Sequence, residues 1–168
     1  VVDEEVVTRI RGAFQIGDAR RLSEDPRFGL ILLAEIADRA LSPSVNDPGT
    51  AIAVLGIQLR LLAKWNRHAA ESSEVQYPDV EVPPLTPDDL LDDSFTPISR
   101  DGAAMVEVGI RLQKCFWTLA GMGNPELQKA ALRHSRLAYE QAEPALSADE
   151  HRKAVKALVD RIASEAKE

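Results

Sequence analysis

Apolar residues recur along most of the chain at spacings of three and four, the period of one face of an α-helix. This spacing predicts six longer helices, over residues 3–15, 26–41, 48–70, 97–121, 124–142 and from 147 onward. The segment 48–70 is apolar on two faces, so we expect that helix in the centre of a bundle. The pattern therefore predicts an all-α fold, an irregular bundle of about six helices.

Several prolines stand directly after a residue that caps helices, and these pairs mark helix starts. Proline suits the first helical position, where its missing N–H needs no partner, and it pushes the preceding residue out of the helical conformation. A further start is predicted by Ser147-Ala148-Asp149-Glu150, which has the sequence of a capping box. The residues that precede such a proline are Asp25, Asp47, Thr86, Thr96 and Asn124.

Residues 71–99 interrupt the helical spacing with serine and proline pairs. We expect a long, proline-rich connection here, with one short helical turn or two after Thr86. Connections of this length are uncommon in compact domains and are often functional. The length of 168 residues fits one domain, so we interpret residues 1–168 as a single α-helical domain.

Composition excludes several classes of function. The net charge is −7 and no basic cluster is present, which argues against nucleic-acid binding. No window reaches the roughly 20 apolar residues that a membrane helix requires. A single cysteine, Cys115, forbids an intrachain disulfide and lies among apolar residues, so we expect a buried, inert thiol.

Catalytic and metal-binding motifs are not recognisable in the sequence, and we assign no catalytic residue, metal ligand or cofactor. No histidine lies four residues from another histidine or from the cysteine. His134 and His151 fall on apolar stripes, which favours packing roles, although folding could bring distant ligands together. The residues favour a non-enzymatic role; a hydrolase using Asp25 or Asp47 with a metal ion is the weaker alternative.

The loop over residues 42–47 is the strongest candidate for a small-ligand or ion site. It is polar, lies between two apolar helices and precedes a helix start, whose free N–H groups attract anions. The alternative is a corner between two helices in which the polar side chains satisfy only local backbone groups. The candidate ligand-binding residues are Ser42, Ser44, Asn46, Asp47 and Thr50, with Arg20 and Asp25 nearby. Arg20 and Asp25 could instead brace the segment that leads into helix 26–41.

Residues 14–51 contain a distinctive series of short motifs. The series reads Phe14-x-Ile16-Gly17-x-x-Arg20, Asp25-x-x-Phe28-Gly29 and Ala40-Leu41-Ser42-Pro43-x-x-Asn46-Asp47-Pro48-x-Thr50-Ala51. It resembles the soluble C-terminal part of a bacterial family of predicted membrane proteins, domain of unknown function 2254. Three positions depart from the family pattern, because Arg21, Glu24 and Ser44 stand where it has threonine, glutamine and glycine.

The resemblance implies a full-length protein of the bacterial inner membrane, with N-terminal membrane helices followed by this soluble region. It supplies no activity. We therefore expect a regulatory, binding or self-association module that contacts the membrane only through segments outside this chain. A homo-oligomer is the partnership we consider, and any small ligand is unidentified. The lone thiol favours the cytoplasmic side.

Overall fold

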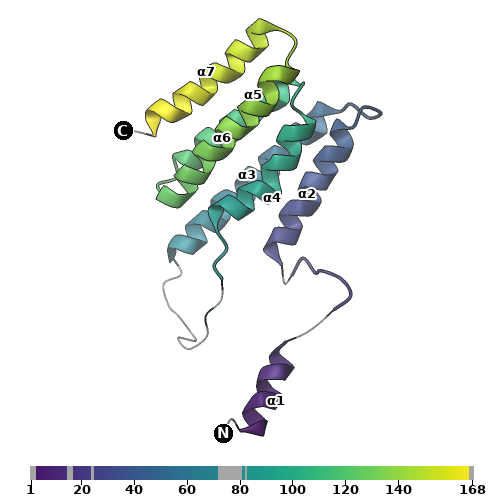
Figure 1. Ribbon diagram of the computed structural model, residues 1–168, viewed down its shortest axis with the longest axis vertical. Helices are drawn as coiled ribbons and strands as arrows, with labels where there is room; N and C mark the ends of the chain where they lie inside the picture. Colours follow the sequence, from purple (N-terminus) through teal and green to yellow (C-terminus); the bar gives the residue numbers. More distant parts are fainter. Residues whose placement is uncertain (1–2, 15–16, 24, 72–80, 82, 167–168) are drawn as a thin grey trace.

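The computed structural model describes residues 3–14, 17–23, 25–71, 81 and 83–166, and within them every regular element is a helix (Figure 1). The all-α prediction is confirmed. Seven helices are formed by these residues: α1 (Glu4–Ala13), α2 (Pro26–Leu41), α3 (Pro48–Glu71), α4 (Pro87–Asp101), α5 (Val106–Ala120), α6 (Pro125–Ala145) and α7 (Asp149–Glu165).

Four of the predicted start signals cap helices as expected. The Asp25 carboxylate accepts from the backbone N–H of Phe28 at the start of α2. Asp47, Thr86 and Asn124 make the corresponding bonds at α3, α4 and α6. Each such cap stabilises a helix by about 1 kcal/mol. The local sequence therefore fixes where these four helices begin.

The fifth predicted helix start, at Thr96-Pro97, is wrong, and so is the predicted helix over 97–121. Pro97 lies inside α4, which runs from Pro87 to Asp101, and the connection after α3 ends at Thr86. A proline inside a helix costs about 3 kcal/mol or more, whereas burying one large apolar side chain contributes about 1.5–3 kcal/mol. The burial of several such side chains outweighs the cost of Pro97. The buried apolar residues of α4 are Leu90, Leu91, Phe95 and Ile98.

The predicted capping box at Ser147 is also wrong. α7 begins at Asp149, and its N-cap residue Ala148 has no side chain that accepts a hydrogen bond. Arg152 closes this turn instead, because its guanidinium donates to the Leu146 carbonyl and to the Asp149 carboxylate.

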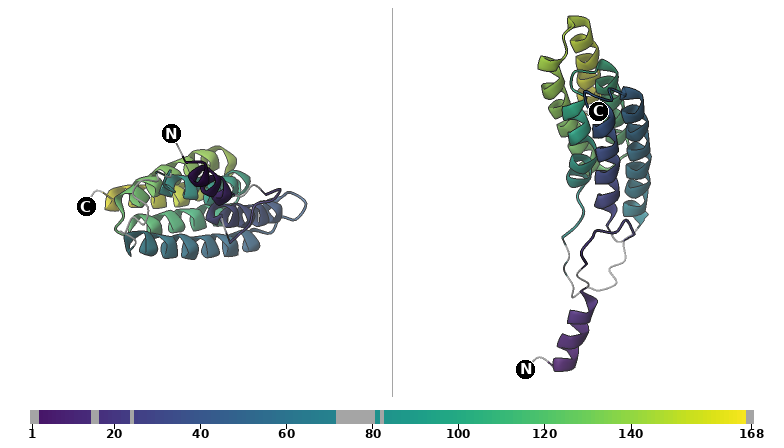
Figure 2. Two further views of the ribbon diagram at one scale, coloured as in Figure 1. Left: turned by 90° about the horizontal axis from the view of Figure 1, so that it is seen from below. Right: turned by 90° about the vertical axis from the view of Figure 1, so that its right-hand side faces the viewer.

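α4, rather than α3, is the inner helix of the bundle. It packs against α2 on one side and α6 on the other, while α5 packs against α6 and α7. α3 lies at an edge of the bundle in both views of Figure 2. Its Leu55 and Leu62 are buried, whereas Ile57 and Leu61 are 37% and 44% exposed. The expectation of a central α3 is therefore wrong, and one of its apolar faces remains uncovered.

An aromatic contact joins α4 to α5 in the core. The rings of Phe95 and Phe116 meet edge to face, with centroids 5.2 Å apart. Cys115 is fully buried beside them, and burial raises the pKa of its thiol to about 11. The predicted burial of this thiol is confirmed.

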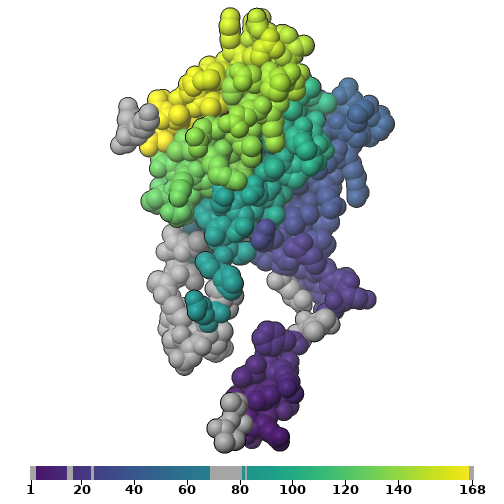
Figure 3. All heavy atoms as spheres, in the orientation of Figure 1, coloured from purple at the N-terminus to yellow at the C-terminus, as the bar shows by residue number. Residues whose placement is uncertain are grey.

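α1 stands apart from the other helices (Figure 1, Figure 3) and packs against none of them in the described chain. Its apolar stripe is exposed: Val6 is 44%, Ile10 55% and the following Phe14 75% accessible. Helices shorter than about 12 residues are marginal on their own in water. None of the helices in the described ranges is both long and apolar enough to cross a bilayer.

The corner between α2 and α3 depends on one left-handed residue. Asn46 has a φ of 50° and is alone among the described non-glycine residues in having a positive φ. Ser44, where the family pattern has glycine, is not in that region. The Asp47 N–H donates to the Ala40 carbonyl at 2.8 Å, which closes the corner. Asparagine tolerates this conformation better than most residues because its side chain is short and polar.

We expect Asn46→Gly to keep the wild-type stability and Asn46→Ala to lower the free energy of unfolding by about 1 kcal/mol, since a Cβ is disfavoured in the left-handed region. Chemical denaturation followed by circular dichroism measures the difference. Ser44→Ala is the matched control and should change stability by less than about 0.5 kcal/mol. Equal stability of the alanine and glycine variants at position 46 would contradict the role of this backbone conformation.

Candidate functional site

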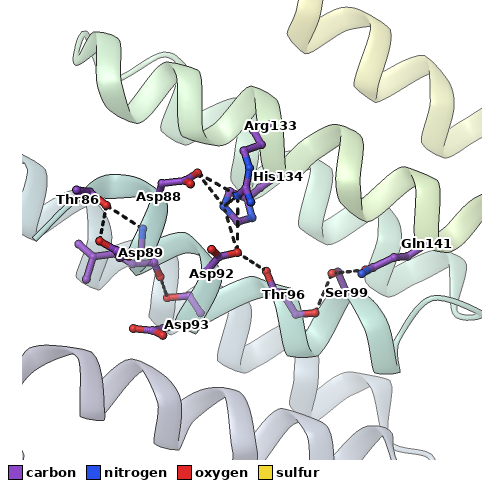
Figure 4. Close-up of polar contacts among 12 residues, drawn as sticks. Thr86, Asp88, Asp89, Asp92, Asp93, Thr96, Ser99, Arg133, His134 and Gln141 are labelled. Carbon is purple, nitrogen blue, oxygen red and sulfur yellow. Dashed lines mark hydrogen bonds and ion pairs between the residues drawn. The ribbon is translucent and has the colours of Figure 1, made fainter.

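Two carboxylates and an imidazole meet between α4 and α6 (Figure 4). Asp88 and Asp92 stand one turn apart on α4, and His134 comes from α6. The His134 Nε2 atom lies 3.3 Å from Asp88 Oδ1 and 3.7 Å from Asp92 Oδ1. One potential ligand atom from each of the three residues lies within 4.8 Å of the other two. We call these three residues the Asp–Asp–His cluster.

A guanidinium nitrogen occupies the middle of the Asp–Asp–His cluster. Arg133 Nη1 lies 3.1 Å from Asp88 Oδ1, 3.7 Å from Asp92 Oδ1 and 3.0 Å from His134 Nε2. Arginine only donates hydrogen bonds. His134 Nε2 can therefore accept from Arg133 when its proton is on Nδ1, or donate to Asp88 Oδ1, 3.3 Å away, in the other tautomer. The side chain of Arg133 is 48% exposed, so it reaches this position from the solvent side.

His134 is the buried member of the cluster, with 2% of its surface exposed. Burial lowers the pKa of its imidazole, against the opposing effect of the Asp92 carboxylate. The ring also stacks on Phe116, with centroids 6.3 Å apart. On the α4 side, Thr96 Oγ1 donates to Asp92 Oδ1 at 3.0 Å. Burial therefore disfavours the charged form of the imidazole, and the stacking on Phe116 orients the ring beside the two aspartates.

Helical spacing places these side chains. Asp88 and Asp92 are four residues apart and so share a face of α4. Asp88 is in the first turn, where a negative charge interacts favourably with the helix dipole. His134 lies on the buried stripe of α6, formed by Leu127, Ala131, His134 and Ala138. The packing of α4 on α6 brings the two faces together.

A solvent-accessible hollow of about 270 Å³ lies beside Arg133. Its lining carries charges of both signs beside apolar surface. The residues that line it are Thr86, Pro87, Asp88, Glu126, Lys129, Ala130, Arg133 and Arg136.

A second hollow, of about 330 Å³ and lined almost wholly by apolar atoms, lies between α2 and α3. We call it the α2–α3 groove. Leu61 at its edge is one of the exposed apolar residues of α3. Its lining residues include Gly29, Leu33, Leu61, Leu62, Trp65 and Leu90.

The 42–47 loop satisfies much of its polarity locally. The Ser42 hydroxyl donates to the Arg39 carbonyl at 2.7 Å. Asp47 accepts from the backbone N–H and the hydroxyl of Thr50, and the hydroxyl bond is the main reason that its pKa is lowered. Ser44 and Asn46 are exposed. The loop thus has the features of a corner between helices, and a ligand there stays a prediction.

Arg20 and Asp25 form an ion pair of 2.6 Å, as expected for residues that brace the segment before α2. The hydrogen bond from Arg20 is the main cause that lowers the pKa of Asp25. α2 has 16 residues, which separates its two ends by about 24 Å. The expectation that this pair lies near the 42–47 loop is therefore wrong. Asp25 and Asp47, the carboxylates considered for a hydrolase, both cap helices.

The sequence did not predict the Asp–Asp–His cluster, because residues 71–99 were expected to be a connection. A signal was present. Thr86 followed by Asp89 has the spacing of a capped helix start, and the Thr86 and Asp89 side chains bond to each other at 2.5 Å. A helix begun there places Asp88 and Asp92 on one face.

The seam between α2 and α4 carries two further ion pairs. Arg27 binds Asp93 through two hydrogen bonds, of 2.6 and 3.1 Å. Asp38 is less well paired, because the Arg100 guanidinium lies 3.8 Å away and Asp38 Oδ1 is buried without a hydrogen-bond partner among the described residues. Burial raises the pKa of Asp38 to about 6, with a smaller contribution from Asp101 and an opposing one from Arg100.

These observations describe a class of protein: an all-helical domain with an uncovered apolar groove and a carboxylate–imidazole cluster. A profile of the family described as a predicted membrane protein, DUF2254, matches residues 2–118. The chain belongs to this family, as the resemblance predicted. The match includes Asp88 and Asp92 and ends within α5, before His134.

Known relatives add no activity. Uncharacterized proteins of Mycobacterium bovis and of two strains of Mycobacterium tuberculosis are each 58% identical to this chain over 40 residues. The matched segment is 24% of this chain and 8% of each relative. No solved structure matches the chain.

Asp38 should make stability depend on pH. Because the pKa of Asp38 is raised from 3.8 to about 6 in the folded state, proton binding at this carboxyl stabilises the fold. This contribution is complete below pH 4 and is lost as the pH rises through 6. We therefore expect Asp38→Asn to exceed the wild type in free energy of unfolding by up to about 3 kcal/mol at pH 7.5, with the advantage vanishing near pH 4.

Urea denaturation at a series of pH values measures this difference. Glu140→Gln removes an exposed carboxylate from α6 that does not contribute to the Asp38 shift and is the control, with an expected change below about 0.5 kcal/mol at every pH. An Asp38→Asn advantage that does not vary with pH would show that titration of this carboxyl is not the cause.

Proposed function

We propose that this chain is a self-association module of a membrane protein, in which the apolar stripe of α1 from one copy binds the α2–α3 groove of a second copy. The observation that carries the proposal is the presence, in the described residues, of an apolar groove that no described helix covers and of an amphipathic helix that packs against none of the others. Insertion of an amphipathic helix into an apolar groove is a common mode of recognition.

The groove favours an apolar helical occupant. It is lined by leucines and by Trp65, and it continues into the exposed Ile57 and Leu61 of α3. These two residues stand four apart, so they form a continuous ridge along the helix. Apolar surface of this kind, at the edge of a bundle, often marks a site of protein–protein contact.

α1 has the properties of such an occupant. Val6 and Ile10 are four residues apart on one face, and Phe14 follows one turn later. A helix of 10 residues gains little from its backbone alone. Burying each large apolar side chain would contribute about 1.5–3 kcal/mol. Docking would therefore stabilise the helix as well as the assembly.

The described residues just before α2 make contacts with one another and with the start of α2. Arg20 is held by its ion pair with Asp25 and lies over the Phe28 ring, 5.0 Å from its centroid. These contacts order the described residues just before α2, and α1 stands apart from the bundle (Figure 1). α1 contacts none of the other described helices, so its apolar stripe is available to a second molecule.

Self-association is one form of the regulatory or binding role that we expect from the sequence. A module that pairs copies of a membrane protein can regulate how those copies assemble.

We also propose that this domain lies on the cytoplasmic side of the membrane. The support for this is Cys115, a buried thiol whose chemistry is compatible with a reducing compartment.

Size-exclusion chromatography with light scattering tests the proposal. We expect the full chain to form a concentration-dependent dimer or larger oligomer, and Ile10→Asp or Leu61→Asp to weaken it at least tenfold, about 1.4 kcal/mol. Both side chains are substantially exposed, so the variants should stay folded by circular dichroism. Val45→Asp, at an exposed apolar position in the 42–47 loop, is the control and should associate like the wild type.

Two outcomes would contradict the proposal. One is a strictly monomeric wild type at several hundred micromolar. The other is that Ile10→Asp and Leu61→Asp lower the melting temperature of a monomeric protein by an amount that does not depend on protein concentration. That result would show that α1 binds the groove of its own chain.

A further inference from the structure

We propose that Asp88, Asp92 and His134 bind a divalent transition-metal ion, and that the ion enters by displacing the guanidinium of Arg133. The site uses the face of α4 that contacts α6. It therefore goes beyond the proposed self-association, which uses the α2–α3 groove.

The distances in the cluster suit a metal ion. Zinc binds imidazole nitrogen and carboxylate oxygen at about 2.0–2.2 Å, so two donors on a tetrahedral ion stand about 3.4 Å apart. His134 Nε2 lies 3.3 and 3.7 Å from the nearest oxygens of Asp88 and Asp92. Small side-chain adjustments would complete the geometry. Three protein ligands leave a fourth position for water or another ligand.

The orientation of His134 is an independent observation. The side chain is 98% buried, yet its Nε2 atom faces the two carboxylates rather than the apolar core. Nε2 also lies 3.0 Å from Arg133 Nη1, and in the tautomer with the proton on Nδ1 its lone pair points at the centre of the cluster. This is the lone pair that a metal ion requires.

Arg133 Nη1 stands in for the cation. It lies within 3.7 Å of all three donor atoms, so the cluster already holds positive charge at the place where the ion would bind. The guanidinium is about half exposed and adjoins the hollow lined by Glu126 and Lys129, into which it can swing. Ion and guanidinium are thus competitors for the same two carboxylates.

The donor set indicates which ions compete best. Magnesium and calcium prefer sites built from oxygen ligands alone, whereas an imidazole nitrogen favours zinc, cobalt, nickel and copper. A mixed site of one nitrogen and two oxygens therefore favours the second group.

Titration of the full chain with Co²⁺, followed by its visible absorption and by displacement with Zn²⁺, tests the proposal. We expect saturable binding by the wild type and at least tenfold tighter binding by Arg133→Gln, because the competitor is gone. Asp88→Asn and Asp92→Asn should each weaken binding at least tenfold. Both aspartate side chains are 46% exposed, so these variants should fold.

Glu140→Gln is the matched control, since it removes an exposed carboxylate from α6 and should bind like the wild type. Binding that survives both aspartate substitutions, or no binding by either the wild type or Arg133→Gln below 1 mM, would overturn the site (a millimolar Kd is only about −4 kcal/mol). Equal or weaker binding by Arg133→Gln would overturn the displacement.

Discussion

The burial of α4 between α2 and α6 is the constraint on which the rest of the structure depends. Its apolar side chains fill the middle of the bundle, and the contact between Phe95 and Phe116 ties it to α5. The helix forms in spite of Pro97, since the apolar burial exceeds the cost of one internal proline. Without α4, the carboxylates of the cluster would have no fixed position, and Leu90 would not close the base of the α2–α3 groove.

Helix starts were predictable where the signal is local. The Asp25, Asp47, Thr86 and Asn124 caps each act within three residues, so the sequence alone suffices. Thr96 before Pro97 has the same appearance but a different role, because its hydroxyl donates to Asp92 one turn earlier in a continuing helix. Only the tertiary burial of Phe95 and Ile98 distinguishes the two cases, and a short sequence window does not contain it.

The candidate sites depend on contacts that the sequence does not display. His134 meets Asp88 across 46 residues, and the prediction gave the helix that carries the carboxylate only one or two turns within a connection. The two apolar faces of α3 were visible in the sequence, but such a pattern fits either an inner helix or an edge helix with a face free for another molecule. The exposure of Ile57 and Leu61 selects the second case. The family was recognisable from short motifs around the α2–α3 corner, which lies far along α2 from the Arg20–Asp25 pair.

The aspartates of α4 that bind arginines on two neighbouring helices influence the register in which α4 packs in the bundle. Asp88 and Asp92 are held by Arg133 on α6, whereas Asp93, the next residue along, is held by Arg27 on α2. A slip of α4 by one residue would rotate it by about 100° and move it by about 1.5 Å. In one direction Asp89 and Asp93 would replace Asp88 and Asp92 opposite Arg133, but Ser94 would replace Asp93 opposite Arg27. In the other direction Arg27 would face Asp92, but Arg133 would lose both of its aspartates. The helix register is thus specified from two sides by charge, in addition to the apolar stripe, and misaligned packings of this inner helix are disfavoured.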